Sequence, residues 1–177
     1  MHMVIRAIVY AENKEDALDN ARDIFDKLCE RGTFDYFTMF DEEGSCVSGR
    51  GRWGNLTPVA KVTSPEGKEL IDEGWEATVR EFKSAMKEIR KIIAQFTDEE
   101  IMEEKTVKEK DFFMPRYQFY CIGQYDGSGI WLYDNDGSGI RTRHHLDNAL
   151  TKWPDLDHTS EEYKGLEVWI VPADVHY

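Results

Sequence analysis

A glycine-rich segment with two arginines and a tryptophan is the first group of residues whose types and spacing could do chemistry. It reads Ser48-Gly49-Arg50-Gly51-Arg52-Trp53-Gly54. Glycines let a backbone approach a ligand closely, and arginines offer forked donors that suit phosphate or carboxylate. Trp53 adds a flat face for stacking. The segment therefore fits a site for a small anionic or nucleotide-like ligand. The alternative is a glycine-rich bulge whose arginines pair with the protein's own carboxylates.

A second group, Asp174-Val175-His176, lies next to the last residue of the chain. Residues two apart on an extended chain face the same side, and histidine can carry or donate a proton near neutral pH. We predict that this group meets the glycine-rich segment at one end or edge of a sheet, where Arg52 pairs with Asp174. No catalytic residue is assigned. The candidate ligand-binding residues are Arg50, Arg52, Trp53, Asp174 and His176.

The remaining polar motifs predict neither a metal site nor a cofactor. Asp134 to Gly139 begins like a calcium loop, but His145 stands where a bidentate glutamate is needed. A hairpin turn explains this stretch better. The adjacent pair His144-His145 cannot easily serve one metal from a helix, because neighbouring side chains point in different directions. There is also no Cys-x-x-Cys pair, phosphate-binding loop or Gly-x-Ser-x-Gly nucleophile motif.

The elements that must position these residues begin with a strand at Val4–Tyr10 and a helix capped by Asn13. The helix carries apolar residues at helical spacing: Ala17, Leu18, Ala21, Ile24, Phe25 and Leu28. A second strand is expected at Phe34–Phe40. Glu42–Gly54 is expected to form a loop or a pair of bulged strands, followed by a short strand within Leu56–Thr63.

A long helix is expected to start at Ser64 as cap with Pro65 in the first helical position. Its apolar stripe steps by three and four residues through Val79, Phe82, Met86, Ile89, Ile93 and Phe96. We expect the stripe to be buried, either against the sheet or in a homodimer seam, because it also keeps a seven-residue repeat. Thr97 and Glu100 predict a capping box for a further helix.

The last part of the chain predicts more strands and one short helix. Strands are expected at Tyr117–Tyr125 and Leu166–Val171, with a β-meander around the Asp-Gly turns near Ile130–Tyr133. Thr142 is expected to cap the short helix. This order of elements predicts one α+β domain over residues 1–177, with a mostly antiparallel sheet covered by helices on one face. A ferredoxin-like core is the expected arrangement.

Three patches of the sequence resemble a group of uncharacterised proteins common in phages and prophages. Phe34-Asp35-Tyr36-Phe37 and Gly49–Gly54 are similar to that group's Trp-Asp-Trp-Tyr … Gly-Gly-Arg-Trp pattern. Tyr125-Asp126-Gly127 with Trp131 is similar to its late Pro-Asp-Gly-x-Trp turn, and Asp174-Val175-His176 to its terminal Asp-x-His. This chain has phenylalanines for the first Trp and the Tyr, Arg50-Gly51 for the Gly-Gly step, and an insertion at Asp41–Ser48. The resemblance implies a shared fold and a phage setting, not a reaction.

Composition limits the function classes. The 177 residues include 35 acidic and 22 basic ones, for a net charge of −13. This excess argues against direct nucleic-acid binding. There is no apolar run long enough for a membrane span, and the three widely spaced cysteines fit a cytoplasmic location. We expect a binding or regulatory protein with a protein partner or a small anionic ligand. The alternatives are a small hydrolase that uses Arg52, Asp174 and His176, and an acidic mimic of nucleic acid.

Overall fold

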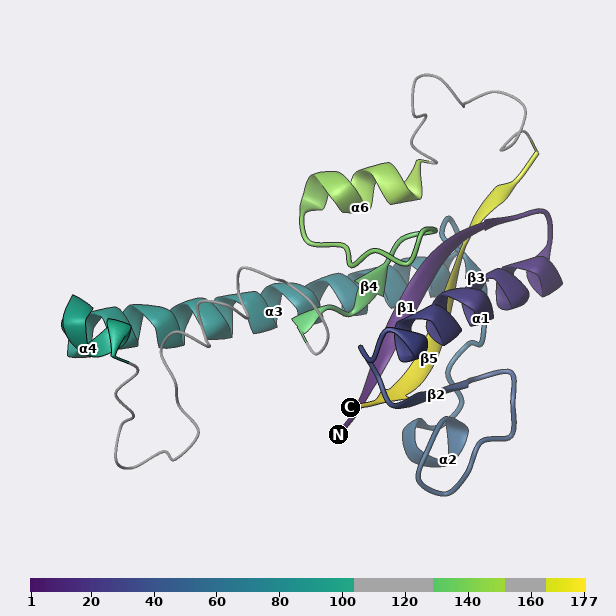
Figure 1. Cartoon of the computed structure of the whole chain (residues 1–177). Coiled ribbons are helices and arrows are strands. Elements are labelled where there is room, and N and C mark those ends of the chain that lie inside the picture. The colour runs from purple at the N-terminus through teal and green to yellow at the C-terminus, as the bar shows by residue number, and fades with distance from the viewer. Residues whose placement is uncertain (104–128, 152–164) are drawn as a thin grey trace.

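The computed structural model describes residues 1–103, 129–151 and 165–177, and the structural statements below refer to them (Figure 1). The strand predicted at Tyr117–Tyr125 lies outside these ranges. Within them the protein combines helices with a five-stranded mixed sheet, so the α+β class is confirmed. None of the described helices is long and apolar enough to cross a membrane.

The two ends of the chain form the centre of the sheet. Strand β1 (His2–Ala11) pairs antiparallel with β5 (Glu167–His176) over ten residues, from His2 opposite His176 to Ala11 opposite Glu167. Strand β5 is longer than predicted because it continues through Pro172. On the edge of β5 away from β1, residues 169–170 and 173–176 pair with other strands, and Pro172 lies in the gap between them. The missing N–H of this proline therefore costs no ladder bond on that edge.

Three short strands complete the sheet. Strand β2 (Tyr36–Met39) pairs with residues 173–176 of β5, and β3 (Ala60–Lys61) pairs with residues 169–170 of the same edge. Strand β4 (Leu132–Tyr133) pairs with β1 in parallel. The order is β2-β5-β1-β4, with three antiparallel pairings and one parallel pairing. The ferredoxin-like core is not confirmed.

Helices cover both faces of the sheet, whereas one covered face was predicted from the sequence. Side chains alternate along β1, so Ile5 and Ala7 pack in the cluster that contains α1 (Lys14–Glu30). Ile8 faces the other way and packs with the first half of α3 (Pro65–Gln95) and with α6 (Arg143–Leu150). Both sides of the central strands are therefore apolar, and each needs a helical layer (Figure 1).

The helix starts that the sequence predicted are confirmed. The Asn13 side chain accepts hydrogen bonds from two amides in the first turn of α1, and the Ser64 hydroxyl accepts one from Gly67 N in α3, where Pro65 takes the first position. Thr97 and its capping-box partner begin α4 (Asp98–Met102), and Thr142 caps α6. Each signal is local, because a side-chain acceptor satisfies an amide that the helix leaves free.

The second half of α3 differs from its prediction. Ile89 is buried, but Phe82 is 38% exposed and Ile93 is 57% exposed, so these two are not buried against the sheet within one chain. Their burial in a homodimer seam stays a prediction. The helix runs well past the strands (Figure 1), and its contacts with the sheet core come from residues in its first half, such as Leu70 and Ile71. Helical spacing predicted the stripe, but it could not show where the sheet ends.

Candidate functional site

The glycine-rich segment forms a tight loop that ends in one helical turn, α2 (Arg50–Trp53). The Ser45 and Ser48 hydroxyls lie 2.9 Å apart and close the loop. Gly51 packs so closely beneath Ser45 that an added Cβ would lie 1.9 Å from the Ser45 carbonyl oxygen. Gly49 has a φ of +55°, a conformation that favours glycine. The glycines thus serve to fold this segment, which we call the α2 loop (residues 44–54), into a compact shape.

The structure brings the α2 loop and Asp174 together. The Asp174 side chain has no exposed surface, and its Oδ2 accepts a 2.9 Å hydrogen bond from Gly49 N. His2 Nδ1 lies 3.0 Å and 3.1 Å from the two carboxylate oxygens. A buried carboxylate needs such partners, because burial without them is costly. The predicted contact between the α2 loop and the end of the chain is therefore made by the backbone amide of Gly49. Asp174 also binds the first strand through His2.

His176 lies beside this carboxylate, on the same face of β5. Its Nδ1 is 2.8 Å from Asp35 Oδ2, its Nε2 is 3.1 Å from the Met1 amino group, and its ring stacks on Tyr36 with centroids 5.1 Å apart. The His2 ring meets the His176 ring edge to face at 5.0 Å. We call Met1, His2, Asp35, Tyr36, Asp174 and His176 the terminal cluster. It joins both chain ends to β2, so His176 is ordered by its neighbours.

The two arginines of the α2 loop do not join the terminal cluster. The Arg52 guanidinium lies over the Trp53 ring, 5.6 Å from its centroid. Among the described residues, no ion pair connects Arg52 with Asp174. The Arg50 Nε atom is buried and finds no hydrogen-bond partner in the described part of the chain. Of the five predicted ligand-binding residues, the structure thus brings Asp174 and His176 into one cluster and places Trp53 at a separate pocket.

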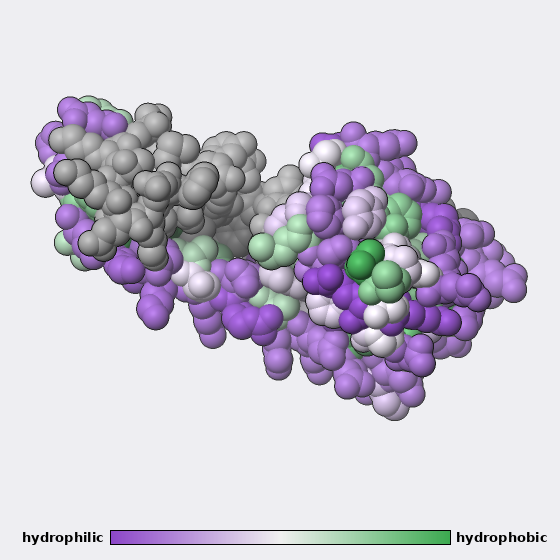
Figure 2. Space-filling view, turned by 90° about the horizontal axis from the view of Figure 1, so that it is seen from below, coloured by the Kyte–Doolittle hydropathy of each residue, from purple (hydrophilic) through white to green (hydrophobic). Residues whose placement is uncertain are grey.

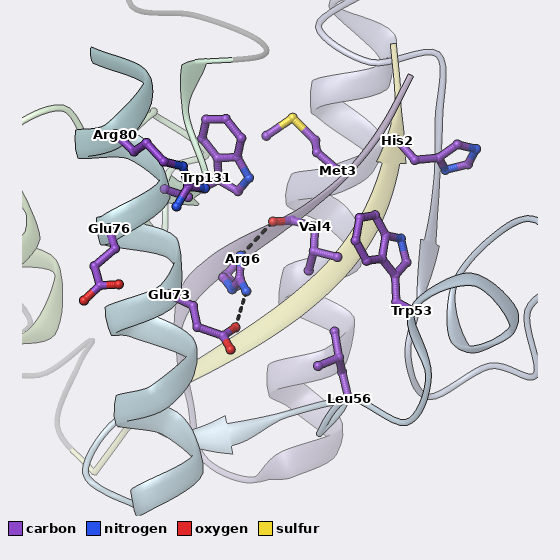
Figure 3. Close-up of a pocket in the computed structure, with 11 residues that line it drawn as sticks. His2, Met3, Val4, Arg6, Trp53, Leu56, Glu73, Glu76, Arg80 and Trp131 are labelled. Atoms are coloured by element: carbon purple, nitrogen blue, oxygen red, sulfur yellow. Dashed lines mark hydrogen bonds and ion pairs between the residues drawn. The ribbon is translucent and has the colours of Figure 1, made fainter. Parts of the chain in front are cut away.

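That pocket has a volume of about 530 Å³ and lies between α3 and the α2 loop, over β1 (Figure 3). Val4 and Arg6 of β1 form its floor. Trp53 and Leu56 stand on one side, α3 on the other, and Trp131, just before β4, closes it from above. His2 also lines the pocket, but its ring turns away from Arg6 in Figure 3. Segments far apart in sequence therefore line an open surface pocket of ligand size.

Arg6 is an unusual residue for the floor of a sheet face. It is 5% exposed, and its Nη2 lies 2.6 Å from Glu73 Oε2 on α3, while its Nη1 donates to the Val4 carbonyl oxygen at 2.8 Å. Burial lowers the pKa of the Arg6 guanidinium, and Glu73 partly offsets this by favouring its charged form. The Arg6 Nε atom is buried and has no hydrogen-bond partner among the described residues. The floor of the pocket therefore contains a buried arginine whose charge is balanced by Glu73.

Of the residues that line the pocket, only Trp53 was predicted from the sequence, and His2, Arg6, Glu73, Arg80 and Trp131 were not. One signal for Arg6 was present, because it is the single charged residue inside the apolar strand Val4–Tyr10. A charge in such a strand is rarely buried unless it is paired. Arg80 gave no signal, because exposed arginines are common on helices. Its place at the pocket depends on which side of α3 faces β1.

The end of the molecule with the two termini and α2 is mostly hydrophilic, with one small hydrophobic patch (Figure 2). The large apolar side chains exposed on the segments at this end are those of Met1, Tyr36, Val47, Trp53 and Tyr177. Single exposed apolar residues are normal on protein surfaces, and only larger continuous patches indicate a docking face. The pocket is therefore a better candidate site than this surface.

The stretch that begins like a calcium loop is a turn organised by Asp134. Its Oδ1 accepts hydrogen bonds from Asp136 N at 3.0 Å and Ser138 N at 2.8 Å, and its Oδ2 lies 2.7 Å from His145 Nε2. Oδ1 is thus used within the turn, and Oδ2 is bound by a histidine of α6. In the described ranges, no group of three or more His, Cys, Asp or Glu side chains is placed to hold a metal ion.

A comparison with protein families identifies the chain as a member of one family. The model of a domain of unknown function (DUF7995) matches residues 1–177, so the chain belongs to that family over its full length. No curated protein and no solved structure matches the chain.

Proposed function

We propose that this protein is a non-enzymatic binding protein that takes a small ligand into the pocket between α3 and the α2 loop. The observation that carries the proposal is the pocket itself. It has a ligand-sized volume, two tryptophans in its lining, and a few charged groups that can fix an orientation. The α2 loop supplies one wall, and the terminal cluster holds that loop in place through Asp174.

The same contacts favour binding over catalysis. A general base must reach the proton it removes, but Asp174 has no exposed side-chain surface, and its oxygens are occupied by Gly49 N and His2. Both ring nitrogens of His176 are also engaged within the cluster. The small-hydrolase alternative required Arg52, Asp174 and His176 to converge. Arg52 instead stacks on Trp53, so no specific observation supports that alternative.

The acidic-mimic alternative also lacks support in the charge pattern. A mimic of nucleic acid needs carboxylates arrayed along one face, in place of phosphates. The second half of α3 instead carries the basic residues Lys83, Lys87, Arg90 and Lys91. These positive charges break up any continuous acidic stripe along the long helix.

The setting of this binding function is part of the proposal. The resemblance of the α2 loop and of Asp174-Val175-His176 to phage and prophage proteins supports a phage or mobile-element origin. The spacing of the cysteines supports a cytoplasmic location. A protein partner remains an alternative to a small ligand. The exposed Phe82 and Ile93 on α3 leave room for the homodimer seam proposed from the heptad spacing.

A ligand-observed NMR screen tests the binding proposal. A mixed set of neutral, cationic and anionic aromatic fragments would be screened against the wild-type protein and the Trp53→Ala variant. We expect hits that lose their signal in Trp53→Ala but keep it in Tyr177→Ala, which removes an exposed aromatic residue that does not line the pocket. Binding that is equal in all three proteins, or absent from all, would contradict the proposed function.

A further inference from the structure

The geometry points to an aromatic anion as the ligand of this pocket, that is, a flat ring system that carries a carboxylate or phosphate group. This inference rests on the proposed function and adds the ligand class. It assigns the anion contact to Arg80 and the ring contact to Trp53, with Trp131 as a second apolar wall. Arg80 and Trp131 were not recognised as site residues in the sequence.

Arg80 is the available cation of the pocket. It lines the cavity from α3, and its side chain extends from the helix beside Trp131 (Figure 3). Among the described residues Arg80 forms no ion pair or hydrogen bond, whereas Arg22 pairs with Asp41 and Glu42. The forked donors of Arg80 suit a carboxylate or phosphate.

Neither carboxylate that lines the pocket forms an ion pair with Arg80. Glu73 is bound to Arg6 at 2.6 Å, so these two charges neutralise each other. Glu76 also lines the cavity, but its side chain points away from Arg6 and Trp131 in Figure 3. A cationic ligand would meet the guanidinium of Arg80 without a neutralising partner. An anionic group can instead pair with this guanidinium.

The aromatic part of the ligand follows from the other walls. Trp53 is 41% exposed, and its ring lies beside Val4, between His2 and Leu56 (Figure 3). The Arg52 guanidinium at 5.6 Å helps to fix this indole. Aromatic rings stack on such a face with a modest gain beyond the buried area. A flat ring can therefore lie against Trp53 while an attached anionic group reaches Arg80 across the cavity.

The net charge of the protein does not oppose this binding at close range. Exposed charges more than about 8 Å apart are largely screened at physiological ionic strength. The distant carboxylates that make up the net charge of −13 thus weaken the approach of an anion more than its final contact. Contacts within the pocket decide the affinity.

Four probes separate the ring from the charge: adenosine monophosphate, indole-3-acetate, adenosine and inorganic phosphate. Binding to the full chain would be measured by equilibrium dialysis. We expect at least one of the two aromatic anions to bind at least tenfold more tightly than both adenosine and phosphate. The comparison of the two anions distinguishes a nucleotide from an aromatic carboxylate. The inference is overturned if adenosine binds as tightly as both anions, or if no probe binds at millimolar concentration.

Substitutions test which side chains contact the bound anion. Arg80→Ala should weaken binding of the aromatic anion at least tenfold, while Arg90→Ala, on the same helix but outside the pocket, should not. Trp53→Phe should retain binding and Trp53→Ala should lose it, with both folds checked by thermal melting. Equal affinity of Arg80→Ala and wild type overturns the inference. If only neutral or cationic fragments bind in a Trp53-dependent way, the ligand class is wrong but the proposed function stands. If no binding depends on Trp53, both fail.

Discussion

Asp174 shows how one side chain can connect distant parts of the chain. It accepts hydrogen bonds from the α2 loop through Gly49 and from the start of β1 through His2, while it lies on β5. Opposite it on β2 stands Thr38, against whose methyl group Gly49 packs. The residue therefore positions the loop that forms one pocket wall. Its role follows from its burial and from the hydrogen-bond partners that occupy its oxygens.

Replacing Asp174 with alanine should destabilise the protein. The change leaves Gly49 N and His2 Nδ1 without their acceptor in a buried site, and each lost hydrogen bond to a charged group costs about 1.5–3 kcal/mol. We expect the free energy of unfolding to fall by about 2–5 kcal/mol in urea titrations. Asp35→Ala is the matched control, because that carboxylate is 66% exposed and also binds a histidine. A change of less than about 1 kcal/mol for Asp174→Ala would show that the contact does not hold the loop.

Among the elements, those with local signals could be predicted from the sequence. Asn13, Ser64, Thr97 and Thr142 each fixed a helix start, because a cap depends on residues within one turn. The end of β5 could not be predicted, because a proline such as Pro172 usually ends a strand. It is accommodated here because β2 and β3 leave a break opposite it. That break depends on strand order, which no local signal contains.

Some residues of the candidate site could likewise be predicted from local sequence, and others could not. The residue types of the α2 loop indicated a ligand, and Trp53 does line the pocket. The partners of Asp174 could not be predicted, because His2 meets Asp174 through the pairing of the first strand with the last, 172 residues apart. Arg52 was expected to pair with Asp174 because opposite charges attract. The backbone amide of Gly49 occupies that place instead, since the tight loop turns it inward.

The long helix offers a comparison between two isoleucines. Ile89 is 5% exposed and Ile93 is 57% exposed, although the two lie one turn apart on α3. Ile89→Asp should lower the free energy of unfolding by more than about 3 kcal/mol, because it buries an unpaired charge. Ile93→Asp should change it by less than about 1 kcal/mol. Both values would come from urea unfolding at one protein concentration.

Similar losses in the two variants would contradict the monomeric burial pattern. They would indicate that Ile93 is covered in solution, as in the homodimer seam suggested by the heptad spacing. Sedimentation of the wild type and Ile93→Asp then decides, because a seam mutation should shift a dimer toward the monomer. No shift would leave Ile93 as an exposed residue on a projecting helix.

The molecule as a whole depends on its two chain ends, which form the central strand pair. All ten residues of β1 pair with β5, and β2 has its ladder partners in residues 173–176. Contacts of such high sequence separation must overcome a large loop-closure entropy before they contribute. The sheet, the terminal cluster and the pocket should therefore form together. In this arrangement the floor and one wall of the pocket depend on the last residues of the chain.

Deletion of residues 174–177 tests this dependence. It removes Asp174, the buried Val175 and three of the four ladder partners of β2, so the α2 loop loses its support. We expect a loss above about 5 kcal/mol, comparable to the whole stability of many domains, and hence a largely unfolded chain by circular dichroism. Deletion of Tyr177 alone is the control, since its side chain is 39% exposed and the ladder of β5 ends at His176. That shorter deletion should leave the melting temperature within a few degrees of the wild type.

A cooperative, near-wild-type transition in the four-residue deletion would show that β1 and α1 form a stable core without the end of β5. The α2 loop would then be an appendage of the fold, and the pocket wall that it carries would be lost independently of the core.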